Sequence, residues 1–174
     1  LGHACISKSN VPWFGLVMGK VTCPTQLGFA GLLADSSDNI EQACHKMAIY
    51  EVLNMVNIRG QSKFNDSLLG NEELITLPKQ NQQRGILQFY SVAPYNDYNY
   101  FVVDSVIAGW YQIITCLCDR DDAIEKVCFE FPPPKYEHKY REYFNCDVLF
   151  NQSNNYLVVK QEALSWRCKN ACSS

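Results

Sequence analysis

The side chains best suited to chemistry in this 174-residue sequence are aromatic, and they fall in two neighbouring segments. Phe89 and Tyr90 lie in a strand-like run, and Trp110 and Tyr111 lie in the apolar stretch that follows it. Aromatic rings that carry a hydroxyl or indole group form pockets in which a small molecule gains apolar contact and a few polar partners. The same rings also serve as ordinary core, and the sequence leaves both uses open. We take these four residues as the candidate ligand-binding residues.

Residues that could perform catalysis or bind a metal do not form a coherent set. The sequence contains no Gly-x-Ser-x-Gly motif and no glycine-rich phosphate loop. Cys44 and His45 are adjacent, but neighbouring positions on a helix face different ways, which favours a core cysteine beside a surface histidine. Asp119, Asp121 and Asp122 resemble the start of a calcium loop without its glycine and terminal glutamate. We therefore predict no catalytic residues, no metal site and no cofactor.

The nine cysteines are an odd number, and their spacing fits neither a disulfide framework nor a zinc site. On a helix, positions two apart lie about 200° around the axis, so Cys116 and Cys118 cannot form a disulfide without unwinding. Buried free cysteine packs like a small hydrophobic residue. We predict mostly unpaired thiols in a reducing cytoplasm and leave open a single reactive thiol.

Composition and charge argue against several classes of function. Hydrophobic residues make up 47% of the chain, which is typical of a globular domain with a sizeable core. The formal net charge of −3 argues against direct binding to nucleic acid, because phosphate contacts need a basic surface. No apolar run approaches the ~18 residues of a membrane helix, and no signal peptide is recognised. We expect a cytoplasmic protein without a membrane partner.

The N-terminal third is predicted to be helical and to contain the scaffold segment Pro24–Asn57. A short apolar helix at Trp13–Gly19 comes first. In the glycine-spaced run Leu27–Leu33, the glycines are expected to let the segment lie close to neighbouring backbone. The run breaks at Asp35–Ser37, and a helix follows whose apolar residues, from Ile40 to Tyr50, recur at helical spacing. Two overlapping capping frames begin this helix: Asp38 with Glu41, and Asn39 with Gln42.

The middle of the chain is predicted to change from strands to a long helix. Gly60 marks the start of the strands, and a hairpin is expected around Gly70-Asn71, between Phe64–Leu69 and Glu72–Leu77. Gly85–Val92 is predicted as a third strand. After a loop at residues 94–99, one apolar stripe predicts the core helix: Val103, Val106, Ile107, Trp110, Ile113, Ile114 and Leu117.

The C-terminal part is predicted as strand, helix, strand and strand. The strand Ile124–Phe131 precedes a charged helix at Lys135–Asn145. Asp147–Phe150 and Tyr156–Val159 are expected to pair with each other across a turn. A last helical turn at Glu162–Trp166 precedes a polar tail. The fold class is therefore α+β in a single domain, with N-terminal helices, an antiparallel hairpin sheet, a long core helix and the strand–helix–strand–strand unit.

Two blocks of residues together resemble a known family. The first block contains Phe14-Gly15-Leu16-x-x-Gly19, Leu27-Gly28-x-x-Gly31, Ser36-Ser37 and Ala43. The second contains Val127-x-Phe129-x-x-x-Pro133, Tyr140-Arg141-x-x-Phe144-x-Cys146-x-Val148-x-Phe150, Leu157 and Leu164. In order and spacing they resemble the N-terminal effector-binding and dimerisation domain of AraC-type bacterial transcription regulators. The similar branch is that of the ornithine- and arginine-responsive activators, not the cupin-barrel branch of the arabinose regulator.

The resemblance covers nearly the whole chain and implies a regulatory function. Residues 1–174 are then a ligand-sensing and dimerisation domain, a fragment in which the C-terminal helix-turn-helix domain is absent. The implied partners are a small-molecule effector, of a class that includes amino-acid-like compounds, a second copy in a homodimer, and DNA only through the absent part. Asn39 and Gln42 stand where the family usually has Thr and Glu, and they can perform the same capping. Two alternatives stay open: a ligand-free constitutive dimerisation module and a small cytosolic enzyme.

Overall fold

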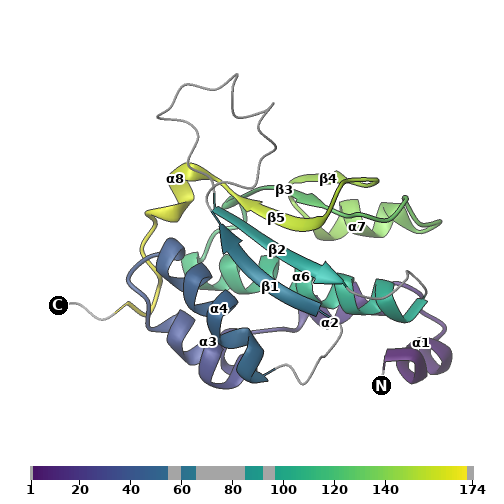
Figure 1. Cartoon of the computed structure of the whole chain (residues 1–174), viewed down its shortest axis with the longest axis horizontal. Helices are drawn as coiled ribbons and strands as arrows, with labels where there is room; N and C mark the ends of the chain where they lie inside the picture. Colours follow the sequence, from purple (N-terminus) through teal and green to yellow (C-terminus); the bar gives the residue numbers. More distant parts are fainter. Residues whose placement is uncertain (1, 55–59, 66–84, 92–96, 172–174) are drawn as a thin grey trace.

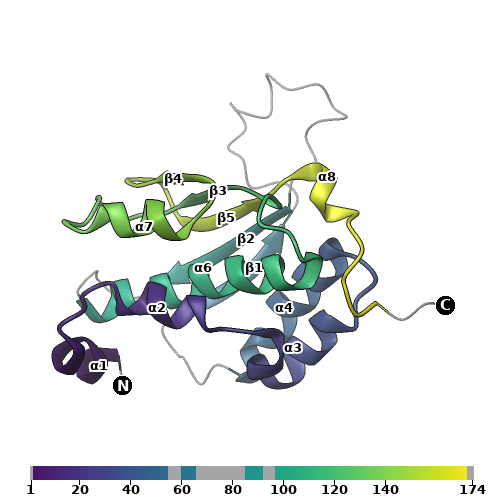
Figure 2. The same ribbon diagram turned by 180° about the vertical axis from the view of Figure 1, so that it is seen from behind.

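The architecture is built around one long helix, α6 (Asp97–Cys118), in a computed structural model that describes residues 2–54, 60–65, 85–91 and 97–171. A mixed sheet lies on one side of α6, and α2 (Phe14–Lys20) lies on the other side (Figures 1 and 2). Helices α3 (Gly28–Asp35) and α4 (Ile40–Asn54) pack at one end of the sheet, beside β1. The order of helices and strands agrees with the predicted α+β class.

The sheet contains five strands in the described part of the chain, in the order β1-β2-β5-β3-β4. The strands are β1 (Gly60–Asn65), β2 (Gly85–Ser91), β3 (Ile124–Cys128), β4 (Asp147–Leu149) and β5 (Asn155–Val159). All neighbouring pairs are antiparallel except β3 and β4, which are parallel. Strand β2 lies within the predicted strand Gly85–Val92, and its side chains alternate between the two faces of the sheet. Leu87 and Phe89 join the main core, while Ile86 joins Val158 in a separate small cluster.

The predicted pairing of the last two strands is wrong. Strand β5 pairs with β2 and β3 instead of with β4. Its residues Leu157, Val158 and Val159 are all fully buried, and burial on both faces is typical of a central strand. Strand β4 instead pairs in parallel with β3, after a connection that contains α7 (Glu137–Tyr143), and such a helical crossover is what a parallel pair requires.

Helix α6 has the predicted apolar stripe, and every residue of that stripe is at most 6% exposed. The helix begins at Asp97, earlier than the predicted start and inside the segment predicted as a loop. Its span Tyr100–Cys118 is long and apolar enough to cross a membrane by composition, contrary to the expectation that no run approaches that length. A buried core helix can have the same length and apolar composition as a membrane span. Because 61% of this window is buried inside the domain, we interpret it as a core helix.

Helix α2 packs very closely on α6 through two glycines. A Cβ atom on Gly15 would lie 2.6 Å from Cβ of Asp104, and one on Gly19 would lie 2.2 Å from Cβ of Ala108. Both distances are below any normal contact, so the helices can approach this closely only with glycine at these positions. Helix α1 (Gly2–Ser9) precedes α2. Helix α2 matches the short helix predicted at Trp13–Gly19 to within one residue at each end.

The scaffold segment Pro24–Asn57 forms a 3₁₀ turn, η1 (Pro24–Leu27), followed by α3 and α4. The expectation of close backbone approach is confirmed at Gly31, where a Cβ would collide with the carbonyl oxygen of Pro24. The second capping frame is used: Oδ1 of Asn39 accepts a bond from the Gln42 amide at 2.9 Å. The Gln42 side chain reaches back to the amide of Asp38 at 3.4 Å. Residues 55–57 lie outside the described residues.

The remaining predictions differ from the structure in detail. Strand β1 begins at Gly60, where the change to strands was predicted, but it ends at Asn65 and shares only two residues with the predicted strand Phe64–Leu69. The hairpin around Gly70-Asn71 lies outside the described residues. The last helix, α8 (Gln161–Leu164), is shorter than predicted. The tail up to residue 171 is held in place, because the Lys169 amide donates to the Leu117 carbonyl at 2.7 Å and the Cys168 amide donates to the Asp38 carbonyl at 3.1 Å. The C-terminal segment therefore joins the end of α6 to the start of α4.

Candidate ligand groove between α2 and α7

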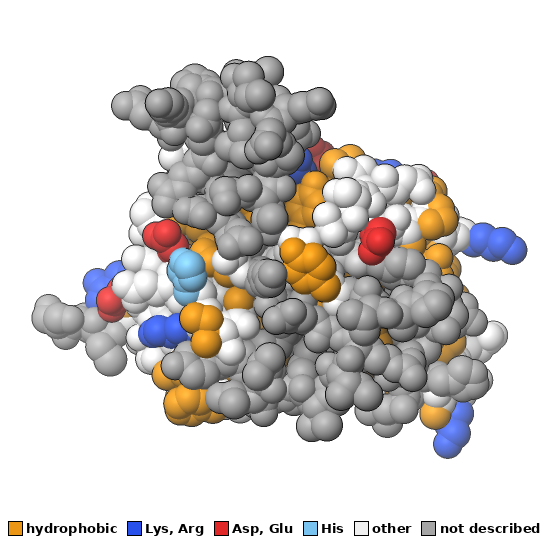
Figure 3. Space-filling model, in the orientation of Figure 1, with side chains coloured by type: hydrophobic (Ala, Val, Ile, Leu, Met, Phe, Trp, Pro, Cys, Tyr) orange, Lys and Arg blue, Asp and Glu red, His pale blue; other side chains and the backbone are white. Residues whose placement is uncertain are grey.

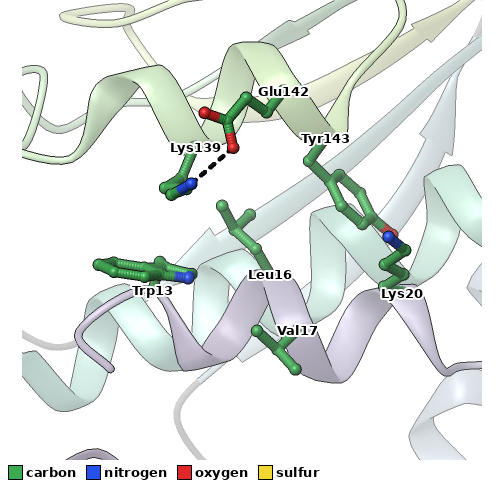
Figure 4. Close-up of a pocket in the computed structure, with 7 residues that line it drawn as sticks. All are labelled: Trp13, Leu16, Val17, Lys20, Lys139, Glu142 and Tyr143. Atoms are coloured by element: carbon green, nitrogen blue, oxygen red, sulfur yellow. Dashed lines mark hydrogen bonds and ion pairs between the residues drawn. The ribbon is translucent and has the colours of Figure 1, made fainter. Parts of the chain in front are cut away.

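A groove with a volume of about 250 Å³ lies between α2 and α7 (Figure 4). One wall comes from the side of α2 next to the face that carries its glycines, and the other comes from α7. The α2 wall also includes Trp13, which immediately precedes the helix. The residues that line the groove are Trp13, Leu16, Val17, Lys20, Lys139, Glu142 and Tyr143. The groove thus combines apolar, aromatic and charged side chains within one concave surface.

One end of the groove contains an ion pair above an indole ring. Nζ of Lys139 lies 2.6 Å from a carboxylate oxygen of Glu142, and it lies 5.6 Å from the ring centroid of Trp13. The bond from Lys139 holds the pKa of Glu142 below its ordinary value. A cation at this distance from an aromatic face is favourably placed. Lys139 therefore has partners on both helices, and it connects the two walls of the groove.

The other end of the groove is formed by Lys20 and Tyr143 (Figure 4). The hydroxyl of Tyr143 donates to the carbonyl oxygen of Ala108 on α6 at 3.0 Å. Burial raises the pKa of Tyr143, so the hydroxyl keeps its proton and stays a donor at neutral pH. The Tyr143 ring also lies 5.8 Å from the Tyr111 ring, centroid to centroid. This residue therefore links the groove directly to the core helix.

A buried acid beside the groove provides a second link to α6. Asp104 is fully buried, and the hydroxyl of Tyr140 on α7 lies 2.8 and 2.9 Å from its two carboxylate oxygens. Burial raises the pKa of Asp104 to about 8, against a smaller lowering by the Tyr140 bond. The acid is therefore mainly neutral at pH 7. A neutral acid can donate one bond to the hydroxyl while it accepts the other, which accounts for two short distances to one oxygen.

Ring contacts connect the buried pair to the groove. Tyr136 lies 5.9 Å from Trp13 and 6.1 Å from Tyr140, measured between ring centroids. Tyr140 also packs edge-on against Phe129 at 5.1 Å. Packed rings therefore run without a break from Trp13 through Tyr136 to Tyr140, which contacts Asp104 and the sheet.

The four residues predicted to bind a ligand are not brought together as one site. Phe89 and Trp110 pack edge-on at 6.5 Å between β2 and α6, with exposures of 1% and 4%. The hydroxyl of Tyr90 bonds to Oε1 of Gln88 at 2.9 Å, on the sheet face away from α6. Tyr111 instead faces α7, where its hydroxyl accepts a bond from the Asn145 amide at 3.0 Å. Of the four, Tyr111 is the one in contact with a groove residue, Tyr143.

Sequence reasoning missed the groove residues because each of them has an ordinary local explanation. Trp13, Leu16 and Lys20 have the spacing of one helix face, and Lys139 with Glu142 forms a common i, i+3 pair on a charged helix. The available signal was the Gly15–Gly19 spacing, which indicates that the surface of α2 outside the glycine face is the one that turns outward. Which helix packs opposite that surface depends on the chain topology and cannot be predicted from the sequence of either segment alone.

The other residues considered for chemistry lie apart from this groove. Cys44 is buried and His45 is exposed, as the helix geometry predicted. The cysteines of the described region, including Cys116 and Cys118, are free thiols. Burial raises the pKa of Cys168 to about 11, which lowers its reactivity as a nucleophile. Across the described part of the chain, no group of three His, Cys, Asp or Glu side chains is arranged to hold a metal ion.

A mixed sheet, a central helix and an open groove of mixed polarity define an α+β domain with a candidate ligand site at its surface. Residues 1–168 match the sequence profile of the N-terminal arabinose-binding domain of AraC transcription regulators, and the chain belongs to this family. The resemblance to the N-terminal domain of AraC-type regulators is therefore confirmed, whereas the branch named from the sequence stays a prediction. The matched family is a domain of transcription regulators.

Structural comparison supports the same fold. The chain is similar to the transcriptional regulator CdpR from Pseudomonas aeruginosa, whose crystal structure matches with a TM-score of 0.69 at 14% sequence identity. The match covers 92% of this chain and 47% of the CdpR chain, so this domain spans about half the length of that regulator. No significant match is found among curated protein sequences.

Proposed function

We propose that this domain binds a small-molecule effector in the α2–α7 groove and thereby regulates a DNA-binding domain attached to it, in the cytoplasm of a bacterium. Family membership supports the regulatory part, and the geometry of the groove supports the location of the effector. The observation that carries the proposal is the double connection of α7 to the core helix. Tyr143 bonds to Ala108, and Tyr140 bonds to Asp104, so the outer wall of the groove is tied to α6 at two points.

The mechanism we propose is a shift between two arrangements of α7 relative to α6. A ligand that contacts α2 and α7 together stabilises the arrangement in which the groove has the right width. Because the Lys169 amide is bonded to Leu117 at the end of α6, a displacement of α6 would also displace the C-terminal segment around Lys169. A tenfold regulatory effect requires only about 1.4 kcal/mol of differential binding.

We also propose that the domain acts as a homodimer. Large apolar side chains are exposed on α3 and α4: Phe29 at 55%, Leu32 at 62% and Ile49 at 64%. Figure 3 shows apolar side chains at the surface in the region of these two helices. Such residues are common in contacts between subunits when they cluster. A second copy of the chain is the partner that we propose for this surface.

The test combines native mass spectrometry with thermal unfolding of the purified domain. We expect a dimer, and we expect at least one compound of a metabolite panel, which should include amino acids and arabinose, to raise the unfolding temperature. Leu16→Glu places a buried charge in the groove floor and should abolish the thermal shift. Leu32→Glu on α3 is the matched control for ligand binding, and it should dissociate the dimer without loss of the shift.

The two alternatives give different results in the same experiment. A stable dimer that responds to no compound would support a constitutive dimerisation module and would contradict the effector proposal. Turnover of a panel compound that depends on a His, Cys or Asp side chain would support an enzyme. A monomer at all concentrations with no bound compound would contradict both parts of the proposal.

A further inference from the structure

We infer that the α2–α7 groove takes a monocarboxylate with an elongated apolar tail. This inference rests on the proposed function, and it adds the chemical class of the effector. It comes from the balance of charges in the groove, the nature of its floor and the length of chain between its two ends.

The charges that line the groove sum to one excess positive charge. Lys139 and Glu142 neutralise each other through their ion pair. Lys20 lies at the other end, is exposed, and forms no ion pair within the described residues. Lys20 is the last residue of α2, and the C-terminus of a helix carries a partial negative charge of at most about one half. The full positive charge of Lys20 is larger than this partial charge. A single anionic group placed beside Lys20 would therefore leave the groove neutral.

The floor between the two ends is apolar. Leu16 is buried and points from α2 toward α7 (Figure 4), and Val17, which also lines the groove, is 40% exposed. Trp13 continues this surface with a flat ring beneath Lys139. An aliphatic or aromatic tail laid on these three side chains would remove apolar surface from water, and a strongly hydrated polar tail would gain nothing there.

The dimensions favour a short, extended molecule. Lys20 lies seven residues after Trp13 in the sequence, and a helical rise of 1.5 Å per residue puts the two ends about 10 Å apart. The volume of about 250 Å³ is below the roughly 300–1,000 Å³ of sites that enclose drug-sized ligands. A carboxylate with a tail of one ring and a short linker fits both limits.

Three compounds with the same body and different charge provide the direct test. Isothermal titration calorimetry of the intact domain would compare 3-phenylpropionate, 3-phenylpropanamide and 3-phenylpropylamine. We expect binding of the acid to be at least about tenfold tighter than binding of the neutral amide, because a charged partner strengthens a hydrogen bond. The amine should bind most weakly, because it meets the unpaired charge of Lys20.

Exposed groove residues provide variants that should fold normally. Lys20→Gln should weaken binding of the acid by about tenfold or more and should leave binding of the amide unchanged. Lys20→Arg should retain most of the affinity for the acid. Val17→Asp adds an anion to the floor and should also weaken the acid selectively. Lys8→Gln removes an exposed lysine on α1 and is the matched control, for which no change is expected.

Several outcomes would overturn the inference. Equal affinity for the acid and the amide would do so, as would equal losses from Lys20→Gln and Lys8→Gln, which would indicate unspecific attraction. If none of the three compounds binds while Leu16→Glu still abolishes the response to another metabolite, the proposed ligand class falls and the proposed function stands. If a metabolite binds and Leu16→Glu has no effect on it, the groove itself is the wrong site.

Discussion

Two aromatic regions of this domain lie close together and differ in what surrounds their rings. Phe89 and Trp110 are enclosed by apolar side chains between β2 and α6, and both are buried. Trp13 and Tyr143 are half-buried, and charged side chains of α2 and α7 lie beside them. The first region gains its energy from burial, whereas the second keeps one apolar surface open. Charge and exposure around the rings, and not the aromatic residues themselves, therefore distinguish the proposed binding surface from the core.

The largest expected difference between the regions is in stability. Trp110→Ala should lower the free energy of unfolding by about 3–5 kcal/mol, because it leaves a cavity in a packed core. Trp13→Ala, the matched change in the groove, should lower it by much less, since its ring is only half-buried. Urea unfolding of both variants measures the difference. Equal losses would show that Trp13 is as much a core residue as Trp110, and the distinction between the regions would fail.

A second prediction concerns the buried acid that joins the two regions. The pKa of Asp104 is about 8 in the folded domain against an ordinary value of 3.8. Between these values the folded state holds a proton that the unfolded state has released, so stability falls as the pH rises. The loss is at most about 1.4 kcal/mol per pH unit and ends above about pH 8. At pH values below 3.8 the contribution is fully present.

Asp104→Asn tests this dependence because asparagine preserves the shape and does not titrate. We expect the free energy of unfolding of the wild type, relative to the variant, to decrease steadily between about pH 5 and pH 8. Urea unfolding at several pH values measures this relative slope. Parallel curves for the two proteins would mean that Asp104 is ionised in the folded state, and the neutral link between α6 and α7 would be disproved.

The smallest expected effect concerns the hydroxyl that connects the groove to α6. Tyr143→Phe removes the bond to the Ala108 carbonyl and should cost about 1 kcal/mol of stability. Thermal unfolding with and without a bound effector would also show whether this link carries the response. Lys139→Gln is the control on the same helix, and it should change stability less, because its ion pair is exposed to solvent. A larger loss for Lys139→Gln would reverse the proposed roles of the two residues.

Several features of the fold could be predicted from the sequence because their cause is local. The stripe from Val103 to Leu117 has helical spacing, and the structure buries every position of it. Asn39 was predicted as a cap, and its side chain makes the capping bond. In each of these cases the residues that determine the structure lie within a few turns of one another, so the backbone geometry of one segment decides the outcome.

The arrangement in space was decided by contacts between distant segments. Strand β5 lies between β2 and β3 and pairs with both of them, instead of pairing with β4 as predicted. Its run of buried residues suits this central position in the sheet. The partners in the Asp104–Tyr140 pair are 36 residues apart in sequence, and those in the Tyr143–Ala108 pair are 35 apart. These hydrogen bonds form only when α7 packs against α6, and the residue pattern of neither helix predicts that packing.

The sequence by itself determined the fold class, the core helix and the regulatory family, because burial patterns and motif spacing are properties of the chain order. Only the tertiary structure decided which aromatic residues are buried between β2 and α6 and which line a groove. The reason is that a groove is a relation between two helix surfaces, and the Gly15–Gly19 contact with α6 determines which face of α2 is left to form it. The proposed carboxylate site at Lys20 depends on that one orientation.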